Sequence, residues 1–419
     1  MNASTAWRDP SGDTRNWAGN VSYRARQVVH PSSLEEAQEL VAGATTVHAL
    51  GTKHSFSNCA DSPDLLLRLD RIASPIEIDP VSSTVTIPGA ARTGDFARVL
   101  DRAGFALHNT GSLPHISIAG AIATGTHGSG DTLGSLSSAV QAIELIRADG
   151  TLAWIDRNSP DFAGSIVAMG ALGIVTRVRL AIEQTYRVRQ DDYFDLPWAS
   201  LTQHFDEITA SAYSVSVFLR WSNDPVASVV LKSRDTSPPA ELFGAKHSPP
   251  RPGTNSNLTE HGSWGPWWDR LPHFRLDAEP SIGDELQTEY FLPRASAIEA
   301  LAEVGSLGSR IDEALHISEL RTVRADDLWL SGAFGADVVS IHFTWKNRLD
   351  LVARLLPVLE ERLLPHGARP HWGKLFAASG RDIRPAFARW NDFVALRRRV
   401  DPQQKFTNDY LDRLFGEQG

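Results

Sequence analysis

Apolar and polar residues alternate over several short stretches of the chain and recur at helical spacing over others, without a regular strand–helix rhythm. Ser33 and Glu36 have the spacing of a capping box, so a helix is expected to open at residues 31–36. The pattern up to residue 184 predicts an α+β domain in two lobes rather than a doubly wound fold. Its expected strands are 21–30, 47–50, 65–69, 105–108 and 174–182, its hairpins 75–88 and 139–155, and its further helices 93–103 and 160–170.

The pattern changes from Tyr186 onward, where longer alternating stretches are separated by a loop rich in Pro, Gly and Trp at 237–272. This part predicts one large antiparallel sheet with helices, a second α+β domain, and the chain from Phe376 is expected to be helical. We therefore expect domains at 1–184 and 185–375 and a C-terminal segment at 376–419. The elements expected after Tyr186 are strands 214–219, 226–232, 286–292, 316–323 and 338–346 and helices 294–304 and 349–364.

Length, charge and cysteine count exclude several classes of protein. A chain of 419 residues that is 42% hydrophobic is long enough for more than one core, and its net charge of −9 argues against a nucleic-acid partner. We find no apolar run of membrane-spanning length, and the first residues lack the features of a signal peptide, so a cytoplasmic protein without a membrane partner is expected. Cys59 is the single cysteine, which excludes an intramolecular disulfide and a cysteine-based metal cluster, and we expect no metal.

Two glycine-containing stretches suggest a bound phosphate ester. Residues 108–130, HNTGSLPHISIAGAIATGTHGSG, contain no Lys or Arg, and their small side chains let the backbone approach a ligand near a helix start at Ser117. By itself this stretch could equally be a glycine-rich turn between strands. Residues 47–56, VHALGTKHSF, predict a strand that breaks at Gly51 into a loop presenting His54. Two such turns would hold the two ends of a long dinucleotide.

Three further pieces carry candidate chemistry. In 316–323, Glu319 and Arg321 fall on one face of a strand, where the alternative is an ordinary surface ion pair. In 338–346 the residues Ser340, His342 and Thr344 form a polar face that meets either water or a polyol, opposite a wholly apolar face. In RPHWGK at 369–374, a glycine that permits close backbone approach precedes Lys374.

These motifs, in this order, resemble the vanillyl-alcohol-oxidase-type flavoproteins and, among them, the alditol oxidases. The similarity runs from NWAGN at 16–20 to FTN at 406–408. It implies a two-lobed FAD-binding domain and a substrate domain, or cap, with a large antiparallel sheet, with the C-terminal segment returning to the FAD domain. It also implies oxidation of the terminal primary alcohol of alditols to the aldose, with xylitol and sorbitol as the expected substrates and glycerol as a further candidate. The hydride would go to FAD, and O2 would reoxidise the flavin and yield H2O2, in a monomeric enzyme.

The resemblance also implies which residues bind the cofactor. His54 corresponds to the position that carries FAD on a ring nitrogen through the 8α-methyl group, although Lys53 departs from the small residue common before it. A second link through Cys59 is not expected, since the glycine-rich stretch has no cysteine. The expected cofactor-binding residues are Gly51, Thr52, Lys53, His54, Ser55, Ser112, Ser117, Gly120, Ala121, Ile122, Thr124, Gly125, His127, Gly128, Ile174 and Asn408.

The same resemblance places the substrate against six side chains, Ser112, Glu319, Arg321, His342, Thr344 and Lys374. His342 is the candidate base because its titration lies nearest neutral pH, although a Lys374 of depressed pKa would serve as well. Lys374 and Arg321 would stabilise the developing alkoxide, and Glu319 and Thr344 would bind the remaining hydroxyls. Gly111 would leave room for O2 at the flavin, unless the turn simply requires a glycine.

Three other functions compete with this interpretation. An aldonolactone oxidase or dehydrogenase shares the fold and parts of the Glu–Arg and HWGK patterns. A non-catalytic flavin- or sugar-binding protein would leave His342 and Lys374 without a purpose. An NAD enzyme is weaker still, because GTHGSG at 125–130 is not the GxGxxG fingerprint.

Overall fold

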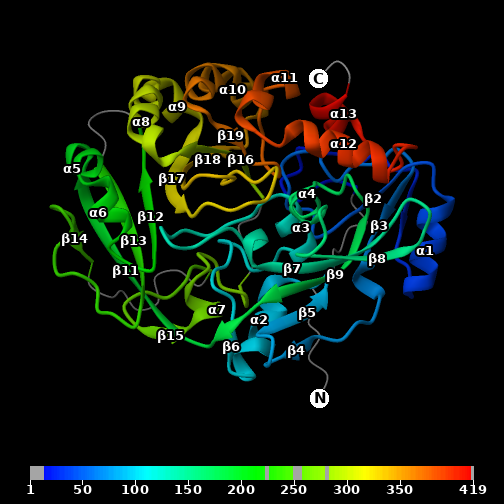
Figure 1. Cartoon of the computed structure of the whole chain (residues 1–419). Coiled ribbons are helices and arrows are strands. Elements are labelled where there is room, and N and C mark those ends of the chain that lie inside the picture. The colour runs from blue at the N-terminus through cyan, green and yellow to red at the C-terminus, as the bar shows by residue number, and fades with distance from the viewer. Residues whose placement is uncertain (1–13, 222–225, 249–256, 279–282, 417–419) are drawn as a thin grey trace.

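The computed structural model describes residues 14–221, 226–248, 257–278 and 283–416 (Figure 1). The expected leader at residues 1–13 and part of the 237–272 loop lie outside these ranges. No helix within the described ranges is long and apolar enough to cross a lipid bilayer.

Residues 14–184 form two small sheets with helices packed against them, as predicted, and a two-stranded pairing. One sheet is parallel, with the order β1-β3-β2, and the other is antiparallel, with the order β4-β5-β9-β7-β8. Ser33 caps α1 by accepting the amide of Glu36, while the Glu36 carboxylate bonds Ser32 instead of closing the box. The bounds are β1 Gln27–Val29, α1 Leu34–Gly43, β2 Val47–Ala49, β3 Leu65–Leu67, β4 Glu77–Asp79, β5 Thr84–Pro88, α2 Thr93–Arg102, β6 Phe105–Ala106, α3 Ile118–Ala123, β7 Val140–Ile146, β8 Leu152–Asp156, α4 Phe162–Ser165, β9 Ile174–Ala181 and β10 Glu183–Gln184, which pairs with β6.

A nine-stranded sheet dominates the rest of the chain and confirms the predicted large antiparallel sheet. Its order is β14-β11-β13-β12-β17-β18-β16-β19, with β15 paired to β11. Helices α8 and α10 pack on β16 and α9 packs on β17, so one face of the sheet is covered by helices (Figure 1). The bounds are β11 Arg187–Pro197, α5 Trp198–Gln203, α6 Phe205–Thr209, β12 Ser214–Leu219, β13 Val226–Arg234, β14 Lys246–His247, β15 Trp264–Pro266, α7 Trp267–Arg270, β16 Glu285–Pro293, α8 Ala297–Ser306, α9 Gly308–Ala314, β17 Leu315–Val323, β18 Val338–Lys346, α10 Leu349–Leu363 and β19 Arg369–Pro370.

The C-terminal segment is helical and returns to the first part of the chain. It contains α11 Gly380–Ile383, α12 Trp390–Val400 and α13 Asp409–Phe415. Lys405 Nζ donates to the carbonyls of Val41 and Ala42 at the end of α1, and the buried ring of Phe406 joins the small core around Val41 and Val47. The domain boundaries at 184 and 375 stay predictions.

Some elements differ from the sequence-based expectation. The strand expected at 21–30 is limited to β1, and the helix expected at 160–170 is limited to the four residues of α4. A Cβ on Gly164 would lie 2.5 Å from the ring of Trp329, so this segment is built for close packing. Strand β11 was not predicted, because only part of its sequence alternates and much of it is polar.

Candidate active site

A continuous cavity of about 840 Å³ lies between the first part of the chain and the nine-stranded sheet. Both glycine-containing stretches contribute to its wall, as do β16, β17 and β18. The structure therefore brings His54 and Lys374, which are 320 residues apart in the sequence, into the wall of one cavity.

The loop at residues 51–57 is tied to the RPHWGK turn. The amide of Phe56 donates to the carbonyl of Gly373 at 2.7 Å, and Ser57 Oγ donates to the carbonyl of Trp372 at 2.8 Å. Lys53 has a φ of 61°, and its carbonyl accepts the amide of Trp17. The loop bearing His54 is thus held at a fixed distance from Lys374.

The two glycine-containing stretches touch each other. A Cβ on Gly51 would lie 2.4 Å from Ser117 Oγ, so glycine is what allows this approach. The amide of Ser117 donates to Thr52 Oγ1, and those of Ile118 and Ala119 donate to backbone carbonyls. Because these three amides are used within the protein, the start of α3 offers fewer donors to a phosphate than the sequence suggested.

The His54 ring is buried and unpaired. Neither ring nitrogen has a hydrogen-bond partner among the described residues, and the ring stacks on Trp17 with centroids 5.6 Å apart. Burial, together with His115, lowers the pKa of His54 to about 4 and outweighs the opposing effect of the Thr52 backbone, so the ring is neutral. A buried nitrogen without a partner is costly, and a covalent bond to a ligand would remove that cost. The residues present therefore fit a flavin attached at this position.

The substrate side of the cavity is one polar face of the nine-stranded sheet. Glu319, His342 and Glu289 are paired across β17, β18 and β16, and Ile317, Thr344 and Gln287 form the next row. The opposite face carries Leu320, Ile341 and Tyr290, whose hydroxyl donates to Glu360 of α10. The strand alternation that predicted a polar face for His342 and Thr344 is confirmed.

Three side chains approach the oxygens of the Glu319 carboxylate. Oε1 lies 3.0 Å from His273 Nε2, and Oε2 lies 3.6 Å from Arg321 Nε and 3.5 Å from His342 Nδ1. Burial alone would raise the pKa of Glu319, but Arg321 and His273 outweigh it and hold the pKa well below its usual range. Glu319 is an anion inside the cavity wall.

A second carboxylate, Glu289, holds both cations of the site. Its Oε1 accepts from the Arg321 guanidinium at 2.7 Å, and its Oε2 accepts from Lys374 Nζ at 2.6 Å. Arg321 also donates to Ser112 Oγ at 3.4 Å, which links it to the glycine-rich stretch. Two cations thus meet at one end of the cavity, as an alkoxide would require.

His342 is neutral at physiological pH. Burial, followed by the charge of Lys374, lowers its pKa to about 4. Its Nε2 is buried and has no hydrogen-bond partner among the described residues. A neutral ring with a free nitrogen can accept a proton.

Sequence reasoning missed Glu289, Gln287 and His273. Glu285, Gln287 and Glu289 occur at every second position of β16, and this polar alternation was the available indication. His273 lies in a loop, and its amide donates to the carbonyl of Ser112 while its ring meets Glu319. No local pattern marks such a residue.

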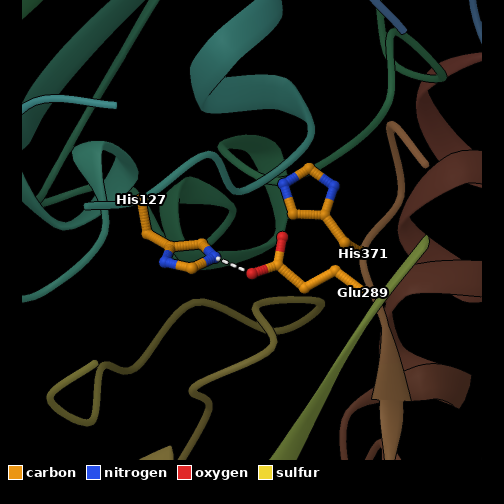
Figure 2. A group of neighbouring side chains, drawn as sticks. All are labelled: His127, Glu289 and His371. Atoms are coloured by element: carbon orange, nitrogen blue, oxygen red, sulfur yellow. Dashed lines mark ion pairs between the residues drawn. The ribbon is translucent and has the colours of Figure 1, made fainter. Parts of the chain in front are cut away.

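Three cavity residues could be considered for a metal ion. His127, Glu289 and His371 place ligand atoms within 4.8 Å of one another, and Figure 2 shows both rings beside the Glu289 carboxylate. His371 Nδ1 accepts the amide of Gly373, and His127 Nδ1 donates to the carbonyl of Gly128. Arg321 and Lys374 already neutralise the carboxylate, so a further cation would be repelled. These contacts favour a salt-bridge hub over a metal centre.

Most of the expected cofactor residues border the cavity, and four are placed elsewhere. A Cβ on Gly128 would lie 2.4 Å from the carbonyl of Thr110, so this glycine serves packing, and Gly125 takes a φ of 73° in a turn. Ile174 is buried in the small core of α1 and β2, while its neighbours border the cavity. Asn408 caps α13 and donates to the carbonyls of Cys59 and Asp61, so it ties the C-terminal segment to the loop after His54. The expected residues that do border the cavity are Gly51, Thr52, Lys53, His54, Ser55, Ser112, Ser117, Gly120, Ala121, Ile122, Thr124 and His127, the last beside Glu289.

Known families match both halves of this arrangement. Residues 25–156 match the FAD binding domain family, and residues 284–414 match the D-arabinono-1,4-lactone oxidase family. The first match covers both glycine-containing stretches, and the second covers Glu289, Glu319, Arg321, His342 and Lys374. The chain therefore carries an FAD-binding domain.

Individual relatives cover nearly the whole chain. It is 41% identical over 408 residues to alditol oxidase of a Streptomyces species, covering 95% of this chain and 98% of that protein. It is 26% identical to L-gulono-1,4-lactone dehydrogenase of Mycobacterium tuberculosis, over 96% and 98% of the two chains. The crystal structure of cholesterol oxidase from B. sterolicum superposes with a TM-score of 0.77 over 96% of each chain at 15% identity, which shows a shared fold.

Proposed function

Since the chain belongs to the alditol oxidase family, we propose that it oxidises the terminal primary alcohol of alditols such as xylitol and sorbitol to the aldose. O2 is the proposed electron acceptor and H2O2 the second product. A cytoplasmic location and a monomeric state are parts of the same proposal.

The observation that carries this function is the pairing of a neutral base with two cations. His342 Nε2 has no partner in the described structure, and Lys374 and Arg321 border the same cavity. Removing a hydride from a primary alcohol requires loss of the hydroxyl proton and stabilisation of the developing negative oxygen. His342 supplies the first and the two cations supply the second.

The tautomer of His342 favours it as the base over Lys374. Its Nδ1 lies 3.5 Å from a Glu319 oxygen, and a carboxylate can only accept, so the proton resides on Nδ1 and the lone pair on Nε2. Lys374 is bonded to Glu289 at 2.6 Å, a contact that favours the ammonium form. An ammonium stabilises an alkoxide but cannot accept its proton.

The remaining polar groups suit a chain of hydroxyls. Glu319, Thr344 and Ser112 border the cavity, and a polyol can both donate to the carboxylate and accept from the hydroxyl groups. Bound FAD would supply the hydride acceptor for this chemistry. His54 is the proposed covalent attachment site, supported by its two unpaired, buried nitrogens.

The role of Gly111 in oxygen access stays a prediction. Ser112, the next residue, borders the cavity. A Cβ on Gly111 would lie 3.0 Å from Thr126 Cγ2, which gives a packing reason for glycine at this position as well.

The second candidate is an aldonolactone oxidase, favoured by the match of residues 284–414 to the D-arabinono-1,4-lactone oxidase family. The test follows H2O2 from purified protein given xylitol, sorbitol, L-gulono-1,4-lactone or L-galactono-1,4-lactone in air. The proposal expects peroxide from the alditols at a kcat/KM at least about tenfold above that for either lactone. A preference for the lactones would replace the first function with the second.

A further inference from the structure

Glu289 lies at the centre of the ionic cluster, in the wall of the cavity. Its side chain is fully buried, and it contacts Arg321 at 2.7 Å, Lys374 at 2.6 Å and His127 Nε2 at 3.1 Å. It is one of two carboxylates in the cluster, and it is the one that Lys374 contacts directly. Glu319 approaches Arg321 only at 3.6 Å.

The charges of the cluster balance only when Glu289 is counted. Arg321 and Lys374 contribute two positive charges, and Glu289 and Glu319 contribute two negative charges. Burial lowers the pKa of three further histidines in the cluster, so these rings add no charge near neutral pH: His273, His342 and His371. A neutral residue at position 289 would leave two buried cations facing one carboxylate.

Lys374 depends on this carboxylate more than Arg321 does. Burial lowers the pKa of Lys374, and Glu289 opposes that shift. A buried ammonium that loses its carboxylate loses its proton more readily, whereas a guanidinium stays charged. The groups that influence Lys374 come from its own turn and from the neighbouring strands: Glu289, Glu319, Arg321, His342 and His371.

Resting on the function proposed above, we propose that Glu289 is a positioning residue for alcohol oxidation, whose carboxylate keeps Lys374 an ammonium and holds it beside Arg321. Glu289 does not touch the reacting atoms itself. It acts through Lys374, which would otherwise be free to turn within the cavity, and through Arg321, which it aligns toward Ser112.

The test compares Glu289→Gln with Glu360→Gln. Glu360 is a buried carboxylate on α10 that bonds Tyr290, the residue after Glu289, from the other face of the sheet. Both variants replace a buried carboxylate by an amide of nearly the same shape, but only Glu289 contacts Lys374. Glu289→Asp is the third variant, because it keeps the charge and shortens the reach.

Two readouts are taken on the holoenzyme. Anaerobic reduction of the flavin by sorbitol, followed from pH 6 to 10, gives the limiting rate and the saturation constant. Competitive labelling with trace acetic anhydride, quantified by peptide mass spectrometry, gives the titration midpoint of Lys374 without any turnover.

We expect Glu289→Gln to lower the limiting reduction rate about 10²–10³-fold at pH 7, with a smaller change in saturation. The Lys374 midpoint should fall by more than one pH unit, and the alkaline decline of the rate should move with it. Glu360→Gln should leave the labelling midpoint of Lys374 and the midpoint of the alkaline rate decline unchanged. Glu289→Asp should reduce its flavin at least about tenfold faster than Glu289→Gln but more slowly than wild type.

A Lys374 midpoint that is the same in wild type, Glu289→Gln and Glu360→Gln overturns the proposal. If Glu289→Gln fails to fold, a Glu289→Asp variant with wild-type rate and midpoint overturns it as well. If wild type is reduced by no alditol, the function is wrong, and the labelling midpoints still decide whether Glu289 controls Lys374.

Discussion

His342 Nδ1 lies 3.5 Å from Glu319 Oε2, and this contact fixes which nitrogen of the ring is free. The carboxylate draws the ring proton to Nδ1 and leaves the buried Nε2 lone pair without a partner among the described residues. Glu319 thus orients His342, which the sequence alone identified only as a candidate base.

The rate of flavin reduction should depend on pH through His342. Its pKa of about 4 means that the ring is neutral above about pH 5, so the rate of reduction by saturating sorbitol should be constant from there to pH 7. Below pH 4 the protonated ring cannot accept the hydroxyl proton, and the rate should fall about tenfold per pH unit. The measurement brings the enzyme rapidly to each pH just before it is mixed with sorbitol and follows the rate of flavin reduction.

The pH jump must be short, because the same shift affects stability. The pKa of His342 is lower in the folded protein than the value near 6.5 in the unfolded chain, so the unfolded chain takes up a proton first as pH falls. The free energy of unfolding is therefore highest above pH 6.5 and declines as pH falls toward 4. Circular dichroism at each pH confirms that the fold persists. A rate that falls with a midpoint near 6.5 would show that another group is titrating.

Replacing His54 should release the flavin. In His54→Ala the covalent link cannot form, so acid precipitation should give a colourless pellet, and activity should fall strongly because the covalent bond retains the cofactor and tunes its potential. His30→Ala, at a histidine paired with Asp70 outside the cavity, is the control and should give a yellow pellet like wild type. A yellow His54→Ala pellet would place the linkage elsewhere.

Substrate preference should follow the number of hydroxyls. When a shorter substrate leaves a buried polar group of the site without its hydrogen bond, transition-state binding weakens by about 1–3 kcal/mol for each missing bond. Sorbitol and xylitol should therefore exceed glycerol in kcat/KM, and glycerol should exceed butanol. Thr344→Val should reduce kcat/KM for xylitol and leave butanol unaffected, while equal efficiencies for butanol and sorbitol would argue against a polyol site.

Lys232 should stabilise the loop that carries His273. Its buried Nζ donates to the carbonyls of Arg270, Leu271 and Pro272 at 2.7–2.8 Å, where α7 ends, and burial lowers the pKa of Lys232 to about 7. Lys232→Met leaves these carbonyls without that donor and should lower the free energy of unfolding by roughly 3–5 kcal/mol in urea denaturation. The exposed Lys246→Met should change it by less than about 1 kcal/mol, and a similarly small effect at Lys232 would contradict this account.

The elements with strong local patterns were predictable. Strand β18, which carries His342, alternates strictly between apolar and polar residues from Val339 to Trp345. Helix α2 ends two residues before Gly104, which takes a φ of 86°. For the same reason the face of His342 was predicted correctly, since alternation alone decides which side chains share a face.

Glu289 and His273 could not be assigned from sequence. Glu289 becomes part of the site through the register of β16 with β18, which pairs it with His342, and a one-residue slip would turn it to the helical face. His273 reaches Glu319 because Lys232 and Ser112 hold its loop. Such placements depend on contacts between residues distant in sequence.

The direct test of the central claim is the rate of anaerobic flavin reduction by sorbitol in wild type, Lys374→Met and His342→Ala, beside reoxidation by O2. The flavin of each variant should be reduced about 10²–10⁴-fold more slowly than that of wild type. His342→Ala removes the base, and Lys374→Met removes a cation that stabilises the alkoxide. Reoxidation should stay close to wild type, since the polyol site does not act in that step. Fast reduction in both variants, or a wild-type flavin that lactones reduce and sorbitol does not, would contradict the account.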